Sequence, residues 1–333
     1  MKPIPSLAGF LGGLCLLASC QGIASPEPVT VTFSLCEGSA GPTRADSEDS
    51  EVRRWALLLF HDGRFADYGL SSSSGPITRT LQTGTYTAYA VANYPETTFH
   101  PESFRITEDL TESSVDLAEN ASGAPVMFGE SRIVLPDEGS GGLQIAVERL
   151  VCKAVLRKVS VDFTDPTLAS QTFVLKSVFL TNCCGVNRYG SDLSPAEIPT
   201  DKSRWYNPMG QSGDGFPAAR DIDAVITPSA PYLSPLAFLF YPNPTGTGQD
   251  THAETWSPRC TRLVIEATIG SRVCYYPVTL PAIRRNQTCL VQEVIIRRAG
   301  SSDPEQEIPD AAEIVFSASV EPWEQQYHDK DAY

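Results

Sequence analysis

The chain has 333 residues, which is enough for about two domains that each bury a hydrophobic core. Its 25 lysines and arginines stand against 40 aspartates and glutamates, and the formal net charge is −15. This charge argues against nucleic acid as a partner, because the phosphates would be repelled. A solvated acidic surface accounts for the charge, which by itself identifies no partner.

The N-terminus has the pattern of a bacterial lipoprotein signal. Lys2 supplies the positive end, Leu7–Ala18 is apolar, and Leu17-Ala18-Ser19-Cys20 is the type of site that a signal peptidase cuts once the cysteine is diacylated. The apolar stretch is too short to span a membrane, so it is a processed segment. We expect residues 1–19 to be removed and lipid on Cys20 to anchor the protein in the outer membrane. The alternative is an ordinary signal peptide that happens to contain a cysteine.

Nine cysteines do not predict a complete disulfide framework. One leaves with the signal and one takes the lipid, so seven of the nine remain, and an odd number cannot all pair within one chain. Cys152, Cys274 and Cys289 lie inside apolar runs, which favours buried small hydrophobic side chains. The adjacent Cys183 and Cys184 have no Cys-x-x-Cys spacing or nearby histidine, so we predict no metal site there.

The mature chain begins with one isolated strand. Apolar and polar residues alternate over 29–35, and a period of two predicts a strand with one buried face. The apolar positions are Val29, Val31, Phe33 and Leu35. Glycine, serine and proline follow at 38–42, and an acidic stretch runs from Asp46 to Glu51. We therefore expect a flexible, protease-accessible loop between this strand and the rest of the protein.

Further strands are predicted along the rest of the chain. Val52–Phe60 is apolar on both faces, as in a buried strand, and ends at the turn His61-Asp62-Gly63. A glycine turn at Gly84 leads into another strand within 81–95. The others are Leu143–Val147, Cys152–Phe163, Phe173–Leu180, Leu263–Ile269, Val273–Leu280, Cys289–Arg297 and Ile314–Val320. Short strands divided by turn residues predict an all-β fold of the sandwich type.

Two segments depart from the strand pattern. Leu110–Leu117 alone has a helical period, and 195–215, rich in Pro, Ser, Asp and Gly, is predicted to be a long surface loop. A shift of composition at 136–142 predicts a domain boundary. We expect a lipid-anchored linker with the first strand over 20–44, an N-terminal β-sandwich over 45–142 and a C-terminal β-sandwich over 143–333.

The chain offers no constellation of residues for catalysis. Its four histidines are scattered without the spacing of a zinc site, and the Gly-x-Ser-x-Gly motif of hydrolases is absent. His61 and Asp62 are expected in a solvated turn. We therefore predict that the protein is not an enzyme and uses no cofactor or metal.

Tyrosines offer an alternative role. Five of them lie in predicted strands: Tyr86, Tyr89, Tyr94, Tyr275 and Tyr276. Aromatic faces stack on sugars, although tyrosines on alternating strands more often fill a sandwich core. The alternative interpretation is a monomeric, lipid-anchored surface module that binds glycan or a host protein.

Several motifs occur in a characteristic order along the chain. They are the lipobox at Cys20, Thr43-Arg44-Ala45-Asp46, Trp55–Gly63, Gly84–Asn93, Val147–Val155, Phe240-Tyr241-Pro242-Asn243, Arg285-Asn286, Gly300–Pro304 and a last strand ending at Trp323. With this order over nearly the whole mature chain, the sequence resembles the fimbrillin family of Bacteroidales, which comprises the pilins, anchors and tip proteins of the type V pilus.

The resemblance implies two transthyretin-like β-sandwich domains in tandem and a structural role in a cell-surface pilus that serves adhesion. It also implies that a trypsin-like protease cuts after an arginine behind the first strand, which then leaves with the lipid. Arg44 is the expected cut site and Ala45 the new N-terminus. Arg53 and Arg54 are less favourable because they adjoin a buried strand.

The resemblance further implies partners. Loss of the first strand would expose unpaired N–H and C=O groups beside an apolar groove, and a strand of the next pilus subunit would fill it. One feature departs from stalk pilins, which tend to end in an apolar donor segment: Glu324–Asp331 is polar, and burying its charges unpaired is costly. This departure favours an anchor or accessory subunit that keeps its lipid and first strand.

Overall fold

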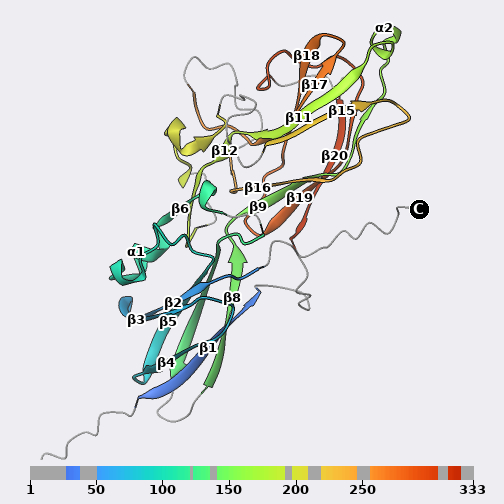
Figure 1. Ribbon diagram of the computed structural model, residues 1–333. Helices are drawn as coiled ribbons and strands as arrows, with labels where there is room; N and C mark the ends of the chain where they lie inside the picture. The colour runs from blue at the N-terminus through green and yellow to red at the C-terminus, as the bar shows by residue number, and fades with distance from the viewer. Residues whose placement is uncertain are drawn as a thin grey trace, which may run out of the picture.

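The computed structural model describes residues 28–37, 51–120, 123–135, 141–191, 197–208, 219–245, 256–306 and 314–323. Within these ranges the chain is all-β, as the sequence predicts, with several sheets and only short helical segments (Figure 1). None of the helices in the described ranges is long and apolar enough to cross a membrane.

The N-terminal strands form two layers around a buried core. The strands are β1 (Val29–Glu37), β2 (Trp55–His61), β3 (Arg64–Ser71), β4 (Ile77–Leu81), β5 (Gly84–Ala92), β7 (Met127–Leu135) and β8 (Gly141–Arg149). They join in the order β3-β2-β5-β7-β8-β1-β4. β8 turns from one layer into the other, because residues 141–147 pair with β1 whereas Glu148 and Arg149 pair with β7. Apolar side chains of β4, β1 and β8 pack against those of β2, β5 and β7 in one cluster between these layers.

β2 is buried on both faces, as its sequence predicts. Its odd-numbered positions, including Trp55 and Leu57, belong to the core shared with β1. Its even-numbered positions, including Leu58 and Phe60, belong to a second core that continues into the C-terminal half. The turn after β2 is the predicted one, with φ of 49° at Asp62 and 73° at Gly63, a left-handed region that favours glycine.

The C-terminal strands also form two sheets. The strands are β9 (Cys152–Leu156), β10 (Val159–Val161), β11 (Phe173–Thr181), β15 (Ala219–Ile226), β16 (Leu236–Phe240), β17 (Arg262–Ile269), β18 (Arg272–Thr279), β19 (Gln287–Ile296) and β20 (Ile314–Pro322). β19 lies between β20 on one flank and β9 and β10 on the other, and β16 pairs with β9. The second sheet has the order β15-β11-β17-β18. Side chains of both sheets belong to a single buried cluster.

The remaining elements are short, and some of them connect the two halves. They are η1 (Pro101–Ser103), α1 (Thr107–Thr111), β6 (Ser114–Asp116), η2 (Leu117–Glu119), α2 (Pro166–Ala169), β12 (Cys183–Cys184), β13 (Val186–Arg188), η4 (Lys202–Arg204) and β14 (Trp205–Tyr206). β6 pairs with β13, so the halves share a two-stranded ladder. The ring of Tyr189 lies 5.7 Å from that of Phe99 and 5.9 Å from that of Phe128, which places C-terminal and N-terminal side chains in one core.

The structure corrects three expectations. The helix predicted for 110–117 is instead α1 at 107–111, because residues 114–116 pair with β13 and this pairing overrides the helical period. In the described part of 195–215 the predicted surface loop is interrupted by η4, whose residues are exposed, and by β14, in which Trp205 is buried. The division expected between 142 and 143 cuts through β8, which pairs only with N-terminal strands.

Candidate functional site: the slot of strand β1

β1 is the middle strand of the layer β4-β1-β8 (Figure 1). It pairs antiparallel with β4, from Val29 opposite Leu81 to Phe33 opposite Ile77. It pairs parallel with β8 over residues 141–147. In the described ranges neither β4 nor this part of β8 has another ladder partner. β1 therefore supplies all the ladder hydrogen bonds of this layer.

The two faces of β1 differ as the alternation predicts. Val29, Val31 and Phe33 are 6%, 1% and 0% exposed and lie in the core between the layers. Leu35 is half-buried and packs against the edge of the same core. Burying a side chain of this kind stabilises the fold by about 1.5–3 kcal/mol. We call the volume that β1 occupies between β4 and β8 the β1 slot.

The outer face of β1 is polar. Thr30 and Thr32 make hydroxyl hydrogen bonds across to β4, to Thr80 at 3.3 Å and to Thr78 at 3.0 Å. These contacts are exposed and add little stability, but they fix the register of the two strands. A strand that entered this slot would need apolar residues on one face and small polar residues on the other.

β4 has its own support on the side away from β1. Arg79 donates to the Tyr68 carbonyl oxygen from Nε at 2.9 Å and from Nη2 at 2.6 Å, and its Nε lies 3.3 Å from Asp67 Oδ2. β3 and β4 approach closely at Gly69, where a Cβ atom would lie 2.5 Å from Ile77 Cγ2. One wall of the slot is thus attached to β3 independently of β1.

The predicted processing residues cannot be placed. Cys20, Arg44 and Ala45 lie outside the described residues. Arg53 and Arg54, the less favourable cut sites, lie in ordered backbone: the Arg53 N–H donates to Asn93 Oδ1, and the Asn93 N–H donates to the Arg54 carbonyl oxygen, both at 2.9 Å. A protease needs an extended, accessible segment, so these bonds disfavour cutting there.

The cysteines of the described ranges are all free thiols. Cys152, Cys274 and Cys289 are fully buried, which confirms their interpretation as small hydrophobic side chains. Burial raises the pKa of the Cys289 thiol to about 11 and that of Cys152 well above its usual value. Such thiols are poor nucleophiles and poor metal ligands. In these ranges no group of three or more His, Cys, Asp or Glu side chains is arranged to hold a metal.

The five tyrosines do not form one platform. Tyr86 and Tyr89 are buried on opposite faces of β5, and Tyr276 is buried in the C-terminal core. Burial raises the pKa of Tyr89 to about 12. Tyr94 and Tyr275 are half-buried and lie in different halves of the molecule. His61 and Asp62 have exposed side chains in the β2–β3 turn, and His61 Nδ1 lies 3.6 Å from Asp62 Oδ2.

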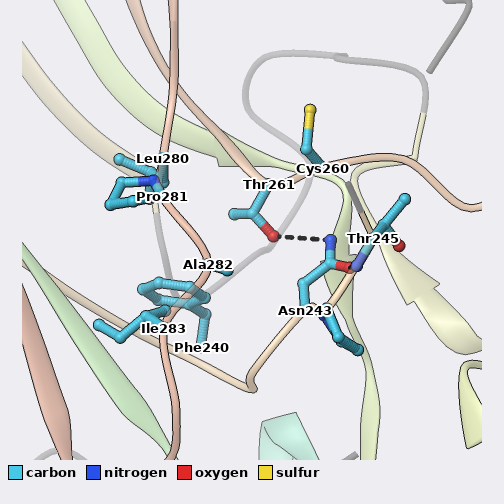
Figure 2. A pocket seen from close by; sticks show the side chains of 10 residues that line it. Phe240, Asn243, Thr245, Cys260, Thr261, Leu280, Pro281, Ala282 and Ile283 are labelled. Atoms are coloured by element: carbon cyan, nitrogen blue, oxygen red, sulfur yellow. Dashed lines mark hydrogen bonds between the residues drawn. The ribbon is translucent and has the colours of Figure 1, made fainter. Parts of the chain in front are cut away.

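A pocket of about 260 Å³ lies in the C-terminal half, where the Phe240–Thr245 segment meets Cys260, Thr261 and residues 280–283 (Figure 2). Asn243, from the motif at 240–243, is 7% exposed. Its Nδ2 donates to Thr261 Oγ1 at 3.0 Å, to the Arg259 carbonyl oxygen at 2.6 Å and to the Asn182 carbonyl oxygen at 3.2 Å. Asn243 therefore joins three separate segments, and its amide serves the fold rather than chemistry.

Sequence reasoning missed two parts of the site. The pairing of β1 with β4 and β8 joins residues far apart in the chain, and no local sequence pattern predicts it. The strand β4 is also absent from the prediction, because Arg79 stands between Ile77 and Leu81 at the position that a period of two would make apolar. The cavity at the Phe240–Asn243 motif likewise has no signal in the sequence.

Solved structures of fimbrial proteins and of a protein described as a putative cell adhesion protein share this fold. A "putative cell adhesion protein" from Bacteroides eggerthii matches with a TM-score of 0.67 at 19% identity, over 89% of this chain and 96% of that chain. A fimbrilin from Porphyromonas gingivalis matches with a TM-score of 0.59 at 14% identity, over 89% and 98%. The tip fimbrial protein Mfa3 of the same organism, with a C-terminal truncation, matches with a TM-score of 0.53 at 14% identity, over 89% and 99%.

Comparisons based on sequence find less. No protein-family model matches the chain, and no curated protein matches it. The structural likeness covers most of the chain, and at these identities it shows the fold alone. The resemblance to fimbrillins that the sequence motifs predict is confirmed at this level.

Proposed function

We propose that this chain, which has the fold of fimbrilins, is a structural subunit of a cell-surface fimbria that serves adhesion and is delivered to the outer membrane by a lipid on Cys20. Its two β halves would be tandem transthyretin-like sandwiches that meet near Leu150, directly after β8. Other subunits of the same fimbria are its partners. The likeness to fimbrial and adhesion proteins supports this role.

The position of β1 carries the proposal. β1 lies in the middle of its layer, yet only the segment 38–50 connects it to the rest of the folded chain. A cut after Arg44 would let β1 leave without breaking any other covalent bond of the chain. The slot would then present N–H and C=O groups on both flanks and an apolar floor, which is the arrangement that strand addition requires.

The donor of the replacing strand is β20 of the next copy. Its sequence alternates like that of β1: Phe316, Ala318 and Val320 interleave with Ser317, Ser319 and Glu321, as Val31, Phe33 and Leu35 interleave with Thr32, Ser34 and Cys36. Side chains 315–320 are exposed, so β20 can leave its own sheet without opening the core. The polar tail after Trp323 lies outside the described residues and need not enter the slot. β20 therefore favours a polymerising subunit over a terminal anchor.

Brief trypsin treatment of the mature protein tests the proposal. Intact mass should show one early cut after Arg44, and electron microscopy and gels should show oligomers after it. Arg44→Ala should stay uncut and monomeric, whereas the matched control Arg53→Ala should behave like the wild type. Cutting without assembly would refute strand exchange. Resistance at Arg44 would instead indicate an anchor that keeps its first strand.

A further inference from the structure

One buried side chain anchors β20 to its own subunit. The backbone of β20 pairs with β19, from Ile314 opposite Ile296 to Pro322 opposite Gln287, but its side chains at 315–320 are exposed. Trp323, the next residue after the strand, is only 5% exposed. Because hydrophobic stabilisation scales with buried apolar area, Trp323 contributes most of what the side chains of 315–323 supply.

The ring of Trp323 lies against two cations. The guanidinium carbon of Arg149 is 5.1 Å from the ring centroid, and Nζ of Lys153 is 5.2 Å from it. Both distances fall within the range of about 6 Å for cation–π attraction, which strengthens where water is excluded. Arg149 is 4% exposed, so at least one of the two contacts is desolvated.

Asn286 completes this group. Its side-chain oxygen accepts from Nη1 of Arg149 at 3.0 Å, and its carbonyl oxygen accepts from the N–H of Trp323 at 3.3 Å. Asn286 is the residue just before β19, the strand on which β20 lies. We call Arg149, Lys153, Asn286 and Trp323 the Trp323 latch.

Arg149 is the last residue of β8, two residues beyond the part of this strand that forms a wall of the β1 slot. β8 is one continuous strand from Gly141 to Arg149. Its residues 141–147 pair with β1, and only Glu148 and Arg149 pair with β7. β1 thus holds β8 in its ladder along most of its length, and β7 holds the end of β8 that carries Arg149.

We propose that the Trp323 latch couples the β1 slot to the release of β20. While β1 fills the slot, β8 is fixed, Arg149 holds Trp323, and β20 stays on its own subunit. When the slot empties, residues 141–147 of β8 lose their ladder partner, Arg149 loosens and β20 is freed. β8 would thus have two states, one paired with β1 and one unpaired. Occupancy of the β1 slot and attachment of Trp323 would both favour the paired state. This inference rests on the proposed function, since it gives a subunit a donor strand only after its own first strand has gone.

Coupling between two sites is reciprocal, so it can be measured in the uncut full-length mature protein. If loss of β1 frees β20, then release of β20 must loosen β1. Trp323→Ala removes the ring and leaves the backbone of β20 intact. We expect amide hydrogen exchange to accelerate in β20 and also, by about fivefold or more, in β1 and in residues 141–149. Lys153→Met, which keeps the apolar stem and removes the charge, should act in the same direction with a smaller effect.

Two controls separate the latch from a general loss of stability. Trp323→Phe keeps an aromatic ring over the cations and should restore slow exchange in β1. Phe316→Ser changes an exposed residue of β20 and should leave exchange in β1 unaltered. Faster exchange in β20 with unchanged exchange in β1 for both Trp323→Ala and Lys153→Met would overturn the coupling.

The trypsin experiment on the wild type distinguishes failure of this inference from failure of the proposed function. Assembly after cutting, with no coupling in the exchange data, would refute the latch and retain strand exchange. Coupled exchange with no assembly after cutting would support the physical link between Trp323 and β1 and refute its use in a fimbria.

Discussion

β1 and β20 are both nine-residue strands near the ends of the described chain, and the fold holds them in opposite ways. β1 is paired on both flanks and buries the side chains of one face, whereas β20 is paired with β19 alone and exposes its side chains at 315–320. To leave its place, β1 would have to lose two ladders and a buried face, whereas β20 would have to lose one ladder and one buried tryptophan. The fold therefore holds β1 more firmly than β20.

Two phenylalanines give the largest contrast between these strands. Phe33 in β1 is 0% exposed, and Phe316 in β20 is 42% exposed. Phe33→Ala should lower the free energy of unfolding by about 3–5 kcal/mol, because it leaves a cavity in the core. Phe316→Ala should change it by about 0.5 kcal/mol or less, as is usual for exposed positions. Urea unfolding of both variants measures the difference, and comparable losses would remove the contrast between the strands.

Two glycines test how closely β7 packs against β8, the strand that forms one wall of the β1 slot. The expected effect is smaller than that of the phenylalanines. At Gly129 in β7 a Cβ atom would lie 1.9 Å from the Ala146 carbonyl oxygen, so one strand must move. Gly129→Ala should therefore destabilise the protein by about 1–3 kcal/mol, as overpacking does. At Gly141, where β8 begins, a Cβ atom would meet no other atom within 4 Å. Gly141→Ala should be close to neutral in the same assay, and equal effects would show that β8 is not closely packed on β7.

The sequence predicts β1 well and its surroundings poorly, and both outcomes have physical causes. β1 has a strict period of two because one of its faces lies in the core and the other in solvent. β3 and β7 escape prediction because their sequences lack a clear alternation: β3 is mostly half-exposed, and in β7 the positions that alternate with Glu130 and Arg132 include Gly129 and Ser131, while Val134 is exposed. The all-β class survives these omissions, since it depends on turns and strand patterns throughout the chain.

The candidate site is harder to predict because it is made of contacts between distant segments. The alternation of β1 reveals a buried face but not that β4 and β8 are its neighbours. The latch is a similar case: Arg149 and Trp323 lie far apart in the sequence and meet through a cation–π contact and through Asn286. The motif at 147–155 contains Arg149, and another motif ends at Trp323, but neither motif indicates that the two residues are in contact.

The smallest expected effect concerns the flank of β19 that faces away from β20. Glu293 accepts hydrogen bonds from Lys158 at 2.8 Å and from Ser160 at 2.7 Å, and these contacts lower its pKa below the ordinary value of 4.5. A carboxylate with a lowered pKa stabilises the folded state above the unfolded-state pKa, and this contribution disappears as the pH falls through the folded-state pKa. Because the side chain is 31% exposed, the contribution should be about 0.5 kcal/mol or less.

Glu293→Gln should remove this small part of the pH dependence when unfolding is measured between neutral pH and about pH 3. Hydrogen exchange in β20 should not follow it, because the partners of Glu293 lie in and beside β10, on the opposite flank of β19. If β20 opened in step with Glu293 protonation, its attachment would depend on the whole sheet. Retained protection of β20 would place its attachment where the comparison with β1 puts it, in the β19 ladder and at Trp323.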